Sequence, residues 1–266
     1  TAMRVMGQNP MPVKEFREYL RVVRALLNGD AVDYTFRNRT TEIQFLHRDR
    51  FYLNLDDHIP IYVAANGPKA CEATGAYGDG WVTIGGDANE IASRLEQIHG
   101  GAQAIGRTLK GDFRTSFLTA PCILRPGEKL TDERIISEVG SWVTTELHFF
   151  YEIWKKAGEP EDLIPEHFTN IWDQYIARVN KFDLPENARF RQIHLDHATH
   201  LVPAEKPFVT PEAIRACCFV GEPEEIIERI KEKEKVGINE INIMPMSDEA
   251  GKVYRDFAEF VLPAFR

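Results

Sequence analysis

The stretch that follows residue 58 constrains the fold of this chain more than any other part of the sequence. An apolar run at 59–65, rich in β-branched residues, leads into an Asn-Gly-Pro-Lys loop at 66–69 and then into an expected helix at 70–77. Short apolar runs of this kind are typical of strands buried on both faces of a parallel sheet. The stretch therefore predicts a strand followed by a helix, the repeating unit of an α/β fold.

A second strand–helix unit follows directly. Residues 81–84 are expected to form the next strand, and a Gly-Gly pair follows at 85–86. Asp87 and Glu90 have the spacing of a capping-box variant, in which two side chains accept the first free N–H groups of a helix. We therefore expect a helix that begins after Asp87 and ends near Ile105.

The rest of the chain continues this alternation, with one long interruption. Residues 131–207 are polar and aromatic, and this length far exceeds the 2–6 residues of an ordinary βα connection, so we expect a helical insertion that forms a lid or an interface. The other expected elements are a helix at 13–28, a hairpin within 32–45, a third strand at 113–124, a helix that begins at 222–225, a fourth strand at 240–245 and a closing helix at 248–265.

The charge balance argues against nucleic acid or an anionic membrane as the main partner. The chain has 32 Lys and Arg against 41 Asp and Glu, a net charge of -9, and such a surface repels polyanions. No apolar run approaches the roughly 18–20 residues of a membrane span, and the first residues lack a signal-peptide pattern. The cysteines have no CxxC spacing, so we expect reduced thiols and a cytoplasmic location.

Both strand–helix loops are candidates for binding a phosphate group. Pro68 lies at the expected first helical turn, where its missing N–H costs least. Backbone N–H groups and the positive end of the helix dipole would then face the carboxyl edge of the sheet. The Gly-Gly pair at 85–86 would lie at the same edge, so that the two loops could close around one phosphate. The alternative is two tight turns that need glycine for a positive φ.

Three histidines recur at intervals of three residues. His194, His197 and His200 would share one side of a helix, and such a group can bind a metal. However, no carboxylate pattern or HExxH motif accompanies them. We therefore expect solvated or hydrogen-bonded histidines and no stoichiometric metal, with a substrate-pocket role for one of them as a separate alternative.

Other chemistry-bearing residues have no assigned role. The aromatic residues between 142 and 154 could line a pocket for a flat ligand, and helix packing explains them equally well. Glu146 and Glu152 lie in that stretch, but general-acid catalysis requires geometry that a sequence does not supply. Cys217 and Cys218 are expected to be small core residues, because no basic partner can be placed beside them. The fingerprints of a P-loop, a GxSxG esterase, a kinase and a GxGxxG Rossmann fold are absent.

Three ordered blocks, which cover about half of the chain, resemble the bacterial luciferase-like monooxygenase superfamily. The nearer branch resembles the deazaflavin-dependent methylenetetrahydromethanopterin reductases. The blocks are 61–69 with 75–81, 18–20 with 26–29, and 220–225 with 237–241.

The resemblance implies a TIM (β/α)8 barrel that binds FMN or the deazaflavin coenzyme F420 at the carboxyl ends of its strands. It implies an oxidoreductase or monooxygenase in which the cofactor carries hydride or oxygen to or from a small organic substrate, while the protein orients that substrate. It identifies no catalytic residue. The residues that would meet the cofactor phosphate are Asn66, Gly67, Pro68, Thr83, Ile84, Gly85 and Gly86.

The resemblance also implies that other barrel strands precede this chain. Residues 1–266 would be the C-terminal portion of a single barrel domain, with about four of its eight strands and the helical insertion at 131–207. Open sheet edges favour association, so we expect a homo-oligomer or pairing with the N-terminal portion. Because the region that holds the cofactor ring would then lie outside this chain, a second hypothesis is a non-catalytic binding or assembly subunit.

Overall fold

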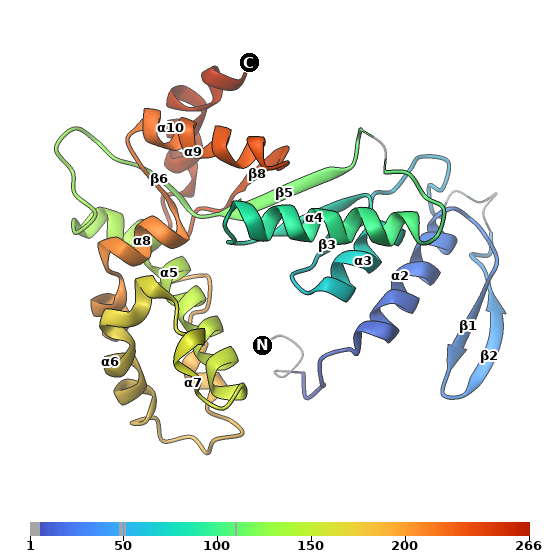
Figure 1. Ribbon diagram of the computed structural model, residues 1–266, viewed down its shortest axis with the longest axis horizontal. Helices are drawn as coiled ribbons and strands as arrows, with labels where there is room; N and C mark the ends of the chain where they lie inside the picture. The colour runs from blue at the N-terminus through green and yellow to red at the C-terminus, as the bar shows by residue number, and fades with distance from the viewer. Residues whose placement is uncertain (1–5, 48–49, 51, 110) are drawn as a thin grey trace. The chain divides into compact units, whose positions relative to one another are not determined.

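The computed structural model describes residues 6–47, 50, 52–109 and 111–266 (Figure 1). The chain divides into two compact units. We call residues 9–117 and 233–241 the sheet unit, and we call residues 118–232 and 242–266, together with 6–8, the helical unit. Each unit is described separately below.

A parallel sheet provides the framework of the sheet unit. Trp81, at its centre, pairs with Val63 on one side and with Thr115 on the other, both in parallel register. This arrangement confirms the expected α/β fold with parallel strands. The sheet has the strand order β3-β4-β5-β8, with β3 (Tyr62–Ala64), β4 (Gly80–Thr83), β5 (Arg114–Thr119) and β8 (Glu240–Ile243), and the last two residues of β5 and of β8 belong to the helical unit.

Strand β3 differs from the expectation for 59–65. It has only three residues and is the outer strand of the described sheet. The Val63 side chain is 3% exposed, whereas that of Tyr62 is 46% exposed. The expectation of burial on both faces was therefore wrong for β3, because its side chains alternate between a buried face with Val63 and an exposed face with Tyr62 and Ala64.

The segment expected as one strand at 113–124 forms two strands. After β5 the chain continues as β6 (Pro121–Ile123), which pairs in parallel with β7 (Phe219–Gly221) in a separate two-stranded sheet of the helical unit. Pro121 has no N–H to donate to a ladder, which favours a break at this point. Strand β7 was not expected, since three buried residues after Cys218 give no periodicity.

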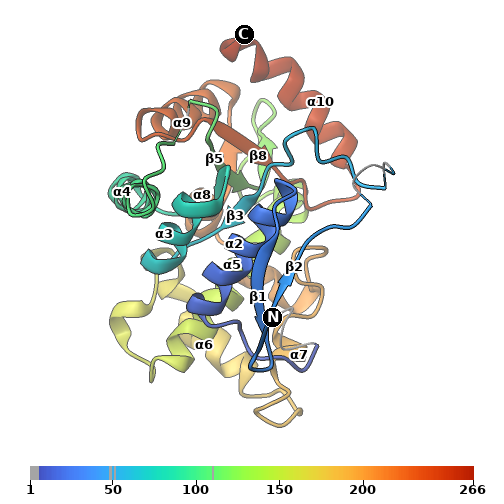
Figure 2. The ribbon, with the colours of Figure 1, turned by 90° about the vertical axis from the view of Figure 1, so that its right-hand side faces the viewer.

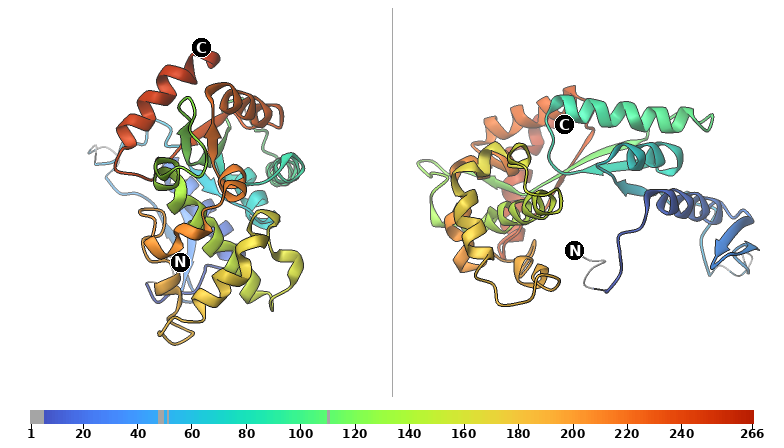
Figure 3. Two further views of the ribbon diagram at one scale, coloured as in Figure 1. Left: turned by 90° about the vertical axis from the view of Figure 1, so that its left-hand side faces the viewer. Right: turned by 60° about the horizontal axis from the view of Figure 1, so that its bottom comes forward.

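Three helices and a hairpin complete the sheet unit. The helix α3 packs against both α4 and α2 (Figure 2), and the hairpin contacts α2 (Figure 3). All of these elements were expected from the sequence. They are α2 (Val13–Leu27), α3 (Pro68–Tyr77) and α4 (Ala88–Gln103), with hairpin strands β1 (Val32–Phe36) and β2 (Arg39–Ile43).

Glycines allow α3 and α4 to approach closely. A Cβ atom on Gly75 would lie 1.7 Å from the Ile98 carbonyl oxygen, and one on Gly101 would lie 2.0 Å from the Glu72 carbonyl oxygen. Gly75 lies within α3. Its role is to leave room for the α4 backbone.

The helical unit contains the segment 131–207 and is mostly helical, as expected. Aromatic side chains on α5 pack against those of α6, including Tyr151 on Trp172 and on Tyr175. Among the described residues, none of the helices combines the length and apolar character needed to cross a bilayer. The main helices are α5 (Glu133–Lys156), α6 (Thr169–Val179), α7 (Phe190–Ile193), α8 (Pro211–Cys217) and α10 (Ala250–Phe260), and α9 (Pro223–Lys235) begins in this unit and ends in the sheet unit.

Short 3-10 turns join or follow these helices. They are η2 (Glu161–Leu163), η3 (Glu166–Phe168), η4 (Pro203–Phe208) and η5 (Leu262–Phe265). The closing segment expected at 248–265 is therefore a helix that ends at Phe260 and is followed by a turn.

The glycine contact between α3 and α4 yields a stability prediction. Gly75→Ala should lower the free energy of unfolding by about 2–3 kcal/mol, because the new methyl group forces the two helix backbones apart. Gly100→Ala is the matched control: it lies on exposed α4 surface, its Cβ would meet nothing within 4 Å, and it should be neutral or stabilise by about 0.5–1 kcal/mol. Urea unfolding measures both, and equal stability of the two variants would contradict the packing argument.

Candidate functional site

The two strand–helix loops identified in the sequence leave the sheet at the same edge. Strands β3 and β4 are parallel neighbours, so their carboxyl ends lie side by side. The buried Trp81 indole donates a hydrogen bond of 2.7 Å from Nε1 to the Ala65 carbonyl oxygen. This bond holds the start of the first loop against β4.

The first loop presents an open helix N-terminus. Gly67 is the N-cap of α3, with extended backbone angles of φ -94 and ψ 156, and Pro68 occupies the first helical turn as expected. No acidic residue lies in that turn, and no side-chain bond caps it within the described part of the chain. Asn66, Gly67 and Pro68 are exposed, and a Cβ on Gly67 would meet nothing within 4 Å. A phosphate group can therefore approach the free N–H groups and the positive dipole end.

The second loop exposes backbone groups, but the N-terminus of α4 that follows it is already capped. The Asp87 carboxylate accepts the Glu90 N–H at 2.9 Å, and Glu90 Oε2 accepts the Asp87 N–H at 3.2 Å. The expected capping box is confirmed, and these carboxylates already occupy the start of α4. Gly85 and Gly86 have φ values of +62 and +98, which explains why glycine is required there. The first loop is therefore the stronger anion site.

Two cationic side chains flank the second loop. Arg94 Nη1 donates to Oγ1 of the buried Thr83 at 3.2 Å, and Lys233 Nζ donates to the Gly86 carbonyl oxygen at 2.9 Å. A Cβ on Gly86 would lie 3.1 Å from Arg94 Nη1. Ile84, between these contacts, is half-buried. The Glu90 carboxylate also lies here, with its Oε2 3.9 Å from Arg94 Nη2.

Sequence reasoning missed both cations. Arg94 carries a signal in its spacing, because it lies three residues after Ile91 and four before Ile98, both fully buried. A charged residue at such a position on the inner face of a helix needs a partner. Lys233 lies far from the loop in the sequence, so no local pattern identifies it.

A pocket of about 780 Å³ lies at the opposite, amino edge of the sheet. Asp79 dominates its charges: it accepts the Ile61 N–H at 2.7 Å, forms an ion pair with Arg24, and lies 3.6 Å from Arg107 Nη2. In barrel folds the carboxyl edge carries the chemistry and the amino edge contributes to stability. Because Asp79 holds both Arg24 and Arg107 against the start of the sheet, we infer that the residues lining this pocket contribute to stability.

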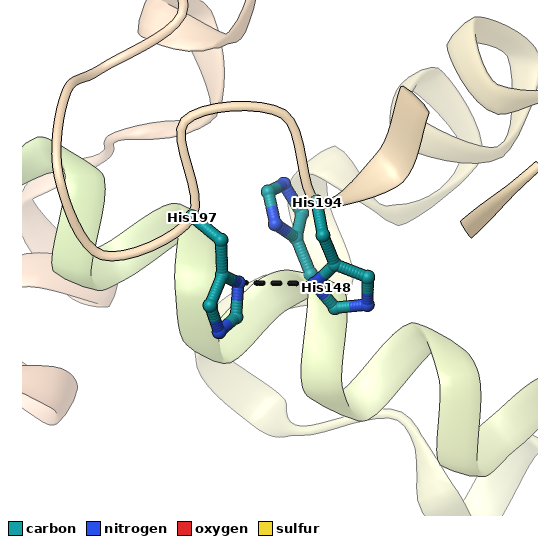
Figure 4. Close-up of side chains that lie close together, drawn as sticks. All are labelled: His148, His194 and His197. Atoms are coloured by element: carbon teal, nitrogen blue, oxygen red, sulfur yellow. Dashed lines mark hydrogen bonds between the residues drawn. The ribbon is translucent and has the colours of Figure 1, made fainter. Parts of the chain in front are cut away.

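The histidines of the helical unit are arranged differently from the expectation. Helix α7 ends at Ile193, so the segment that follows is not a helix with a shared histidine face. His194 and His197 do meet, with their Nδ1 atoms 3.0 Å apart (Figure 4). The third histidine beside them is His148 of α5, whereas His200 is exposed and lies 3.8 Å from Asp248 Oδ1.

One histidine of the cluster, His197, is less basic than an ordinary histidine. Burial lowers the pKa of His197 to about 4, and the neighbouring His194 and His148 contribute in the same direction. At neutral pH the His197 ring is therefore uncharged, with a free lone pair on one nitrogen.

A second cluster joins Glu146 of α5, Cys217 of α8 and His167. Burial raises the pKa of Glu146 to about 7, although the Trp142 indole donates to its Oε1 at 3.1 Å. Such a carboxyl can hold or release a proton near neutral pH. The Cys217 Sγ lies 3.7 Å from His167 Nε2.

The cysteines behave as the sequence indicated. Cys217 and Cys218 are both buried, and burial, followed by the nearby Glu146 charge, raises both thiol pKa values well above the ordinary value. A protonated thiol is a poor nucleophile. His167, which sequence reasoning did not identify as a neighbour, therefore does not make Cys217 reactive.

The raised pKa of Glu146 yields a pH prediction. The folded state holds this proton up to about pH 7, whereas the unfolded carboxyl loses it near the ordinary pKa of 4.5. The wild-type free energy of unfolding should therefore fall, relative to Glu146→Gln, by about 2 kcal/mol as the pH rises through this window. Urea unfolding at pH 5 and pH 8 measures the difference. Glu161→Gln, on an exposed turn, should follow the wild type, and identical behaviour of Glu146→Gln would refute the assignment.

Comparison with known proteins agrees with the resemblance noted in the sequence. One curated relative, the F420-dependent hydroxymycolic acid dehydrogenase of Mycobacterium tuberculosis, is 35% identical over 91 residues, which are 34% of this chain and 23% of the relative.

Two solved structures share the fold. The coenzyme F420-dependent tetrahydromethanopterin reductase of Methanopyrus kandleri matches with a TM-score of 0.59 and 18% identity, over 96% of this chain and 64% of its own. The oxygenating constituent of 3,6-diketocamphane monooxygenase from Pseudomonas putida, in complex with FMN, matches with a TM-score of 0.53 and 13% identity, over 97% and 62%. At such identities the likeness establishes the fold alone, and the chain spans less than two thirds of either structure.

The family model for luciferase-like monooxygenases matches residues 2–240. This match covers both loops at the carboxyl edge and most of the helical unit. The chain therefore belongs to the luciferase-like monooxygenase family.

Proposed function

We propose that the protein containing this chain is an oxidoreductase that transfers hydride between the deazaflavin F420 and a small organic substrate. The close variant is an FMN-dependent monooxygenase. The observation that carries the proposal is the open N-terminus of α3, where Gly67 leaves space and no carboxylate occupies the first turn. The F420-dependent curated relative and the family membership support the same class of chemistry.

The residues at the carboxyl edge fit a phosphate-bearing cofactor. Backbone N–H groups at the start of α3 would hold the phosphate, and Arg94 and Lys233 would add positive charge beside the second loop. When bound, the deazaflavin or flavin ring supplies the hydride or oxygen chemistry, and the protein binds, orients and excludes water. The residues of this chain assigned to cofactor binding are Asn66, Gly67, Pro68, Thr83, Ile84, Gly85 and Gly86.

We also propose that the described strands are part of a larger closed barrel. Strand β3 is an outer strand of the described sheet, and an open strand edge favours further pairing. Strands from the rest of a longer polypeptide, or from a second copy of the chain, would complete the barrel. The substrate would then be a small molecule bound at the carboxyl edge.

Gly67→Val tests the phosphate assignment. The variant should fold normally, because the backbone angles of Gly67 suit valine and its Cβ position is open. It should weaken F420 or FMN binding by about tenfold or more, which corresponds to about 1.4 kcal/mol, because the side chain crowds the backbone that meets the phosphate. Titration of the full-length protein measures this affinity.

Gly111→Val is the matched control for that experiment. Gly111 precedes β5 at the amino edge, and its Cβ would also meet nothing within 4 Å. The control should bind the cofactor as tightly as the wild type. Unchanged affinity in a folded Gly67→Val variant would remove the phosphate site from this loop.

The absorption spectrum of the purified full-length protein tests the choice of cofactor. Flavin and deazaflavin rings absorb at different wavelengths, so a bound chromophore identifies itself. We expect a deazaflavin band, either on isolation or after titration with F420. A flavin band would select the monooxygenase variant. A colourless protein that takes up neither cofactor would favour a non-catalytic binding or assembly subunit.

A further inference from the structure

Three histidines from two separate segments meet in the helical unit. His148 comes from α5, while His194 and His197 come from the turns that follow α7 (Figure 4). One ring nitrogen from each lies within 4.8 Å of the other two. Imidazole nitrogens gathered in this way are typical ligands of Zn²⁺ and related divalent ions.

Two of the three rings have a carboxylate near their other nitrogen. His148 Nε2 lies 3.2 Å from both carboxylate oxygens of the buried Glu205. His194 Nε2 lies 3.2 Å from Glu152 Oε1, although this contact lacks hydrogen-bond geometry in the described structure. Metal-binding histidines commonly donate their outer N–H to a carboxylate, which fixes the tautomer and leaves the inner nitrogen free to coordinate.

The inner nitrogen of His148 has no other use in the described structure. The residue is 1% exposed, and its Nδ1 is buried with no hydrogen-bond partner among the described residues. A hydrogen bond between His194 and His197 explains their 3.0 Å contact, but it leaves His148 Nδ1 unsatisfied. A buried polar atom without a partner is unfavourable, and a bound cation would satisfy it.

The segment that carries His197 is held in place by α5. The Ala198 N–H donates to Thr145 Oγ1 at 3.0 Å, and Thr145 lies one turn before His148. The residues on either side of His197, Asp196 and Ala198, have φ values of +56 and +55. Non-glycine residues adopt this conformation only where surrounding contacts impose it, and such residues concentrate at ligand sites.

We propose that His148, His194 and His197 together bind one divalent transition-metal ion of the Zn²⁺ type. With metal–nitrogen bonds of about 2.0–2.1 Å, tetrahedral geometry places the ligand nitrogens about 3.3 Å apart. The 3.0 Å pair and the 4.8 Å limit bracket this value, so side-chain adjustment suffices. The bound ion would join α5 to the segment 194–200.

This proposal concerns a different set of residues from the one considered in the sequence. The sequence alone predicted no stoichiometric metal for the segment with His194, His197 and His200, and the present proposal departs from that prediction for His194 and His197. His148 takes the place of His200, and the carboxylates that the sequence did not place are Glu205 and Glu152. No residue of the two carboxyl-edge loops takes part, so the proposal does not depend on the proposed function.

Metal binding by the full-length protein tests the proposal. After removal of metals with a chelator, Zn²⁺ is titrated against a chromophoric competitor, and Co²⁺ is titrated while its visible spectrum is recorded. We expect one ion per chain and an intense tetrahedral Co²⁺ band. Zinc should also raise the melting temperature. Binding of less than one tenth of an equivalent at micromolar protein would overturn the proposal.

Single-residue variants test which histidines bind the proposed ion. His197→Ala should lower the zinc affinity by at least about 100-fold, since loss of an outer carboxylate partner alone costs about 10–100-fold. His200→Ala is the matched control, because this exposed histidine lies three residues further along and outside the cluster, and it should bind zinc like the wild type.

A further variant covers the case in which His197→Ala folds poorly. Glu205→Gln keeps the side-chain volume and should weaken zinc binding by about 10–100-fold. Wild-type zinc affinity in either folded variant, or loss of binding in His200→Ala, would place the ion elsewhere and refute this site.

Discussion

The hydrogen bond from the buried Trp81 indole to the Ala65 carbonyl oxygen is the contact on which the carboxyl edge of the sheet depends. A buried indole N–H needs a partner, and here the partner is the last carbonyl before the first loop. The bond therefore holds the end of β3 beside β4 and sets where α3 begins. The orientation of α3 is then fixed by its close contact with α4, where Gly75 and Gly101 leave no room for side chains.

Cationic side chains serve different purposes at the two edges of this sheet. At the amino edge, Arg24 and Arg107 lie around Asp79, which also accepts a backbone N–H from Ile61. Their charge is used within the protein, and it ties α2 to the sheet. At the carboxyl edge, Arg94 and Lys233 contact a hydroxyl and a carbonyl. These contacts, together with the 3.9 Å pairing of Arg94 Nη2 with Glu90 Oε2, hold the two cations beside the second loop.

Features encoded by neighbouring residues could be predicted from the sequence. The capping box of Asp87 and Glu90, the proline at the start of α3 and the hairpin at 32–45 each depend on residues a few positions apart, and each formed as expected. The exposure of Tyr62 could not be predicted, because the place of a strand within its sheet depends on distant segments.

The histidine cluster could not be predicted either, because it also depends on segments that are distant in the sequence. The spacing of His194, His197 and His200 indicated a common helical face, but α7 ends before them. The positive φ values of Asp196 and Ala198 then turn the chain out of a helical path. The histidine that does join the cluster, His148, lies on another helix. Nothing local connects it to the segment 194–200, since their contact depends on how that segment packs on α5.

The burial of all four cysteines determines how their thiols react with oxidants. Cys71, Cys122, Cys217 and Cys218 are buried and free of disulfides, and burial raises the pKa of each thiol. Peroxide and other oxidants attack the thiolate rather than the thiol. The four buried thiols of this chain are therefore poor targets for such oxidants.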